Sequence, residues 1–145
     1  MRTAGVILLA AAVLATASEA QESTPKFSAA YYKCEESAAG SDMAMTECAS
    51  AESERQDKTL NSVYRELVTR VPPDAKQALI KSERAWLSFR DAQCDFEYQQ
   101  VGGTSAHVVG TECELGLTIR RIEELNHSLD LERQFEPKRP KRGSK

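Results

Sequence analysis

Histidine is scarce in this chain, and the residue patterns that catalysis usually requires are missing. Only two histidines occur among the 145 residues, His107 and His127, and neither lies in a recognisable catalytic motif. There is no H-E-x-x-H metal motif, Walker loop, dinucleotide fingerprint or serine elbow. The run from Gly102 to Ser105 lacks the lysine and the strand–loop–helix order of a phosphate-binding loop. We therefore expect a protein that is not an enzyme and that uses no cofactor.

Closely spaced cysteines are also absent, which argues against a metal site. Cys34, Cys48, Cys94 and Cys113 are separated by 14, 46 and 19 residues, without a C-x-x-C pair. An even number of cysteines in an exported protein indicates two disulfides, and three pairings are possible. We favour Cys34–Cys48 with Cys94–Cys113, because each bond then closes one short loop. Each loop would stabilise the fold by about 3 kcal/mol in the chain-entropy model.

No apolar stretch is long enough to cross a membrane comfortably. The stretch from Val6 to Ala17 is shorter than the roughly 20 apolar residues of a spanning helix. Arg2 precedes it, and residues 18–20 place small side chains where a signal peptidase requires them. We predict a signal peptide over residues 1–20, cut after Ala20 or, alternatively, after Ser18. No cysteine follows to carry a lipid anchor, so we expect a soluble periplasmic or secreted protein.

Strand patterns are missing as well, because no stretch alternates apolar and polar residues over a strand's length. Apolar residues recur instead at spacings of three and four. This spacing predicts an all-α fold, a small disulfide-stapled bundle of three main helices plus a short N-terminal helix. The expected helices cover residues 27–38, 43–70, 75–100 and 111 onward.

Local residues suggest where these helices begin and end. Pro72-Pro73 ends the first long helix, and Asp74 is expected to cap the second. Thr111, three residues before Glu114, has the spacing of a capping box for the third. Residues 52–59 are polar all round, so we expect them to be exposed or the helix there to be held only at its ends.

Charge is distributed unevenly along the mature chain. The body, residues 21–136, is expected to form one domain with a net charge of −8. The tail, residues 137–145, carries +5 and is expected to be disordered. An acidic body attracts a cationic partner. The tail lacks aromatic residues, so in an exported protein we expect contact with cell wall or lipid head groups rather than nucleic acid.

The second long helix carries the densest cluster of large side chains. Trp86, the only tryptophan, lies on one wide helix face with Phe89, Arg90 and Cys94. We expect a structural hub in which Trp86 packs in the core and Arg90 reaches a carboxylate on a neighbouring helix. Asp91 is expected to bond a nearby loop.

Several motifs together resemble the family of LprI-type lysozyme inhibitors, from about Cys34 to Leu125. The first two cysteines are followed by Leu60-Asn61-x-x-Tyr64 and then by the Trp86 cluster ending at Cys94. The remaining elements are the Gly102–Ser105 loop, Cys113 and Leu117-Thr118-x-x-Arg121. Phe89 departs from the family, which often has tyrosine there.

The resemblance implies an exported, compact helical protein that binds rather than catalyses, with lysozyme as a partner. Animal-type lysozymes are cationic, which suits an acidic body. We expect a loop from Val101 to Thr111, tethered by Cys94 and Cys113, to enter the enzyme's cleft. Its candidate contact residues are Gly102, Gly103, Thr104, Ser105 and His107. The alternative function is an envelope structural or stress protein that contacts cell wall or anionic lipid through its basic tail; the sequence leaves the oligomeric state open.

Overall fold

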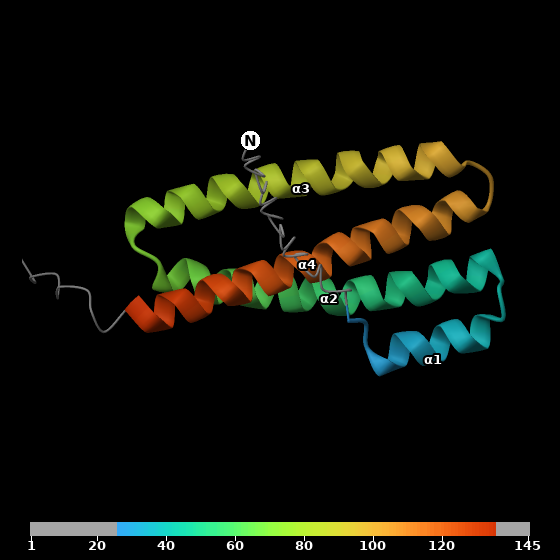
Figure 1. Ribbon diagram of the computed structural model, residues 1–145, viewed down its shortest axis with the longest axis horizontal. Coiled ribbons are helices and arrows are strands. Elements are labelled where there is room, and N and C mark those ends of the chain that lie inside the picture. The colour runs from blue at the N-terminus through green and yellow to red at the C-terminus, as the bar shows by residue number, and fades with distance from the viewer. Residues whose placement is uncertain (1–25, 136–145) are drawn as a thin grey trace, which may run out of the picture.

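The chain folds into one short and three long helices, as the computed structural model in Figure 1 shows. The structure describes residues 26–135; the predicted signal peptide and basic tail lie outside this range. The helices are α1 (Ala29–Ala38), α2 (Asp42–Arg70), α3 (Pro73–Val101) and α4 (Ser105–Phe135). The prediction of an all-α fold with a short leading helix is therefore confirmed. No helix within the described residues is long and apolar enough to cross a membrane.

The two helices α2 and α4 form the centre of the molecule, and the other two flank them. Helix α2 packs mainly against α4, α3 lies along α4, and α1 lies along α2. The α1–α2 and α3–α4 turns lie together at one end, and the α2–α3 turn lies at the other (Figure 1). Because α3 packs mainly against one neighbour, much of its surface is exposed to solvent.

Each disulfide joins a flanking helix to a central one. Cys34–Cys48 links α1 to α2, and Cys94–Cys113 links α3 to α4. The pairing favoured from the sequence is therefore confirmed. Both bonds lie in the half of the molecule that contains the α1–α2 and α3–α4 turns, so this half is cross-linked and the opposite half is not.

The starts of α1 and α2 follow from local sequence, whereas that of α3 differs from the expectation. Ser28 and Ser41 cap α1 and α2, because their hydroxyls accept the backbone N–H three residues later. The expectation that Asp74 caps α3 is wrong. Helix α3 already begins at Pro73, where the missing N–H of proline costs no helical hydrogen bond, and Asp74 lies in its first turn.

Helix α4 begins six residues earlier than expected. We predicted a loop through Gly110 and a helix from Thr111, yet α4 starts at Ser105. The side chains of Ala106 and Val108 are buried, so packing holds this segment in the helix. Thr111 caps nothing; its hydroxyl donates to the carbonyl of His107 one turn earlier. The α3–α4 connection therefore shrinks to three residues.

The core consists of two apolar clusters, one in each half. The cluster near the two turns joins α1, α2 and α4, with Tyr31, Cys48, Ala49, Leu115 and Ile119 buried. The second cluster joins α2 and α4 through Leu60, Leu67, Ile122, Leu125 and Leu129, and Trp86 of α3 packs against it. Between them the expectation of an exposed polar stretch fails at Glu52, whose side chain is fully buried.

Candidate functional site

The two neighbouring turns are joined by hydrogen bonds to a single carboxylate. The hydroxyls of Thr104 and Ser105 donate to Asp42 Oδ2 over 2.8 and 2.9 Å. These hydrogen bonds lower the pKa of Asp42. Gly102 and Gly103 both have φ near +66°, a conformation that side chains rarely adopt, so glycine is required for so tight a connection. The expected cleft-entering loop is thus a short turn fixed against the start of α2.

A hollow of about 660 Å³ lies between these turns. It is lined by Gly40, Ser41, Asp42, Met43, Thr46, Glu47, Thr104 and His107. Met43 stands at its edge with 74% of the residue exposed. The exposed His107 ring packs edge-on against Tyr98, with 5.2 Å between ring centroids. We call residues 39–47 and 101–107 the tip.

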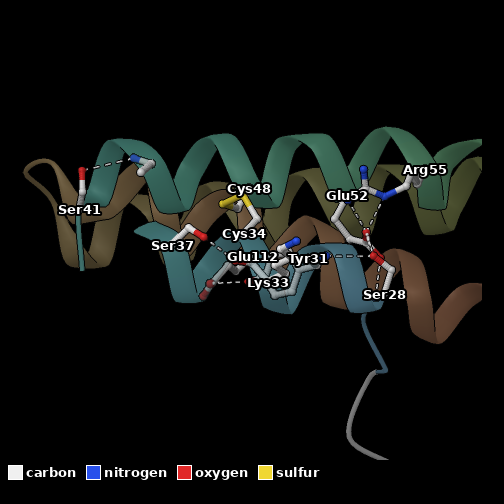
Figure 2. Close-up of a disulfide and its surroundings, with 11 residues drawn as sticks. Ser28, Tyr31, Lys33, Cys34, Ser37, Ser41, Cys48, Glu52, Arg55 and Glu112 are labelled. Carbon is white, nitrogen blue, oxygen red and sulfur yellow. Dashed lines mark hydrogen bonds and ion pairs between the residues drawn. A yellow bond between two sulfur atoms is a disulfide. The ribbon is translucent and has the colours of Figure 1, made fainter. Parts of the chain in front are cut away.

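Helix α1 is held behind the tip by polar contacts as well as by its disulfide (Figure 2). The Glu52 carboxylate accepts the backbone N–H of Ser28 at 2.9 Å and its hydroxyl at 2.7 Å, and it pairs with Arg55. Burial alone would raise the pKa of Glu52, but hydrogen bonds from Ser28, Gln56 and Arg55 lower it to about 2. The burial of Glu52 was not predicted from the sequence, because a single glutamate in a polar stretch gives no sign of burial.

A second polar contact ties α1 to α4. The Tyr31 hydroxyl donates to Glu112 at 3.0 Å, and burial together with the Glu112 charge raises the pKa of Tyr31. Burial also raises the pKa of Glu35, helped by the charge of Glu112. One Glu35 oxygen is buried without a hydrogen-bond partner among the described residues. The charged forms of Tyr31 and Glu35 are therefore disfavoured where α1 faces α4.

Negative charge is concentrated around the tip. Residues 33–54 and 91–119, which we call the head, contain eleven Asp and Glu against one Lys, a net charge of −10. The opposite half, residues 55–90 and 120–135, contains eleven Lys and Arg against eight Asp and Glu, a net charge of +3. The molecule is thus acidic at its disulfide-linked end and weakly basic at the other. This separation is invisible in the overall charge of −3.

The tryptophan cluster lies in the basic half, next to the head. Trp86 is contacted by the guanidinium groups of Arg90 and Arg121, 5.3 and 5.7 Å from its ring centroid. Arg121 pairs with the largely buried Glu83 of α3 at 2.9 Å. Arg90 lies 3.4 Å from the Thr118 hydroxyl of α4 and 3.9 Å from Asp57 of α2. The cluster joins α2, α3 and α4.

Two predicted members of the hub do not make the contacts expected of them. The expectation that Phe89 packs in the hub is wrong, because 53% of this residue is exposed. Asp91 pairs with Arg90, its neighbour in the sequence, instead of bonding a loop. Helix periodicity places Phe89 near Trp86, but α4 covers only part of that wide face. The sequence of one helix does not determine how much of its face a neighbouring helix covers.

The structure is that of a disulfide-linked helical protein with one acidic end, and comparison with known proteins identifies its family. The profile of the family described as lysozyme inhibitor LprI matches residues 34–125, so the chain belongs to this family. That range includes all four cysteines and the tip. An uncharacterized protein of Rhizobium meliloti (strain 1021) is 28% identical over 104 residues, 62% of this chain and 75% of that protein. No solved structure matches.

Proposed function

We propose that this protein is an exported lysozyme inhibitor that binds its target through the acidic head. Membership of the inhibitor family supports the class of target, and the net charge of −10 on the head supports the surface. Opposite charges on the two proteins would speed their encounter and orient the head toward a cationic enzyme. The two disulfides support residence in an oxidising compartment such as the periplasm.

The tip is the part of the head that we propose to block the lysozyme cleft. Glycoside hydrolysis takes place between two carboxyl groups that flank the bond to be cleaved, so a narrow rigid body at the cleft mouth prevents substrate entry. Met43 and His107 offer exposed contact surface there. Thr104 and Ser105 already bond Asp42, so they hold the tip in shape. Few further side chains have to be ordered on binding, so the loss of conformational entropy is small.

Turbidity kinetics of lysozyme on a bacterial cell suspension test this proposal. The oxidised mature protein is expected to slow clearing at micromolar concentration, and less so at high salt, since salt screens exposed charges. The pair Glu47→Gln and Glu114→Gln removes two exposed head charges and is expected to weaken inhibition. The pair Asp74→Asn and Asp130→Asn removes the same charge from the other half and serves as the matched control. Absence of inhibition, or equal loss in both pairs, contradicts the proposal.

A second candidate function is envelope contact through the basic end. The half that carries +3 ends at Phe135, and residues 136–145 add a net charge of +4. Such a basic end suits anionic lipid or cell-wall polymers. Deleting residues 137–145 and measuring co-sedimentation with anionic vesicles or cell walls tests this function. Loss of sedimentation with unchanged lysozyme inhibition would assign envelope contact to the tail alone.

A further inference from the structure

One side of α3 carries an apolar stripe that no other helix covers. Phe89 and Phe96 are 53% and 57% exposed, and their spacing of seven residues places both rings on the same side of the helix. Ala85 and Ala92 are exposed on the same side. Soluble monomers seldom expose large aromatic side chains in a row unless the surface binds something.

A shallow groove runs beside this stripe, between α3 and α4. It measures about 310 Å³ and is lined by Phe89, Gln93, Glu97, Glu112, Cys113, Gly116, Leu117 and Arg120. A side chain added at Gly116 would meet nothing within 4 Å, so the groove is open at this point. The stripe thus lies next to an unfilled depression.

The charges along the groove are arranged in a self-complementary way. Helices α3 and α4 run antiparallel, and the disulfide sets Cys94 opposite Cys113. In this register Arg120 lies toward the Phe89 end of the groove, and Glu97 and Glu112 lie toward the Phe96 end. A twofold rotation about an axis near Ala92 exchanges the two phenylalanines and also brings the basic end opposite the acidic end.

We propose that a second copy of this chain covers the stripe in an antiparallel, twofold-symmetric dimer. Phe89 packs against Phe96 of the partner subunit, and Arg120 faces Glu97 of the partner subunit. The exposed alanines near the axis let the two α3 helices approach closely. Twofold dimers use one self-complementary patch on both subunits, which is the pattern seen here. The two tips then point in opposite directions, and neither tip takes part in the dimer contact.

Sedimentation equilibrium of the oxidised mature protein tests the dimer. Over about 5 to 500 μM, a range that covers small dissociable interfaces, we expect the mass to rise toward twice that of the monomer. Phe89→Glu is expected to weaken dimerisation at least about tenfold, because it places a charge in the apolar contact between Phe89 and Phe96. Tyr32→Glu adds the same charge at an equally exposed aromatic residue on α1, 54% exposed, and is expected to leave the dimer intact.

A charge exchange tests the twofold register itself. Glu97→Arg and Arg120→Glu are each expected to weaken the dimer, and the double variant is expected to restore it, since the opposite charges then meet again. Circular dichroism of each variant confirms that the helices are retained. The proposal is overturned if the protein is a monomer at every concentration or if Phe89→Glu leaves the dimer unchanged. It is also overturned if the double variant dimerises no more tightly than the two single variants.

Discussion

Replacing Glu52 by glutamine tests how the protein holds α1 in place. The substitution keeps the size of the side chain, removes its charge and turns one acceptor oxygen into a donor. Glu52 is fully buried and accepts hydrogen bonds from Ser28, Arg55 and Gln56. A decrease in pKa from 4.5 to about 2 corresponds to about 3 kcal/mol of folding free energy above pH 4.5. We expect Glu52→Gln to lose about this amount at pH 7.

The same carboxylate predicts how stability depends on pH. Because the pKa of Glu52 is lower in the folded state, its contribution is present above about pH 4.5 and is lost as the pH falls toward 2. Between pH 7 and pH 3 this group should lower the free energy of unfolding of the native protein by about 2 kcal/mol. Glu52→Gln should not show this decrease. Urea unfolding followed by circular dichroism at pH 7 and pH 3 measures both effects. Glu54→Gln, two residues further along the chain and exposed, is the control.

The reasoning is refuted if Glu52→Gln and Glu54→Gln unfold with the same free energy at pH 7. It is equally refuted if Glu52→Gln retains the full acid sensitivity of the native protein. Either result would mean that the buried carboxylate is not the group that fixes Ser28 and α1.

Three further substitutions test other parts of the head. Replacing Cys94 and Cys113 by serine is expected to lower the free energy of unfolding by about 3 kcal/mol, measured by urea titration; no loss would contradict the role of this bond. Gly102→Ala is expected to lower the free energy of unfolding by about 1 to 3 kcal/mol, because the φ of +66° and ψ of 174° suit only glycine. An unchanged melting temperature would argue against this turn conformation. Glu35→Gln is expected to raise the melting temperature at pH 7 but not at pH 4. Burial and the Glu112 charge raise the pKa of Glu35, so its charged form is disfavoured at pH 7. A lower melting temperature at pH 7 would exclude this explanation.

Features set by neighbouring residues were predictable from the sequence. Pro72-Pro73 and the glycines after Ala39 and Val101 interrupt the helices whatever surrounds them, so the number of helices followed directly. The disulfide pairing followed from loop length once the helices were placed. Ser41 follows Gly40 directly and caps α2 with its hydroxyl, a contact that involves only the backbone three residues later.

Features set by distant residues were not predictable. The early start of α4 depends on the burial of Ala106 and Val108 by other helices, which overrides the local capping signal at Thr111. The burial of Glu52 depends on Ser28, 24 residues away. The acidic head appears only when the turns of two helix pairs are brought to the same end of the molecule.

Hydrogen exchange of the protein alone and in complex with lysozyme is the most direct test of the proposed head. The account predicts that added protection falls on residues 39–47 and 101–107, while residues 60–80 exchange as in the free protein. Protection confined to residues 60–80, or no change at lysozyme concentrations that saturate inhibition, would contradict it.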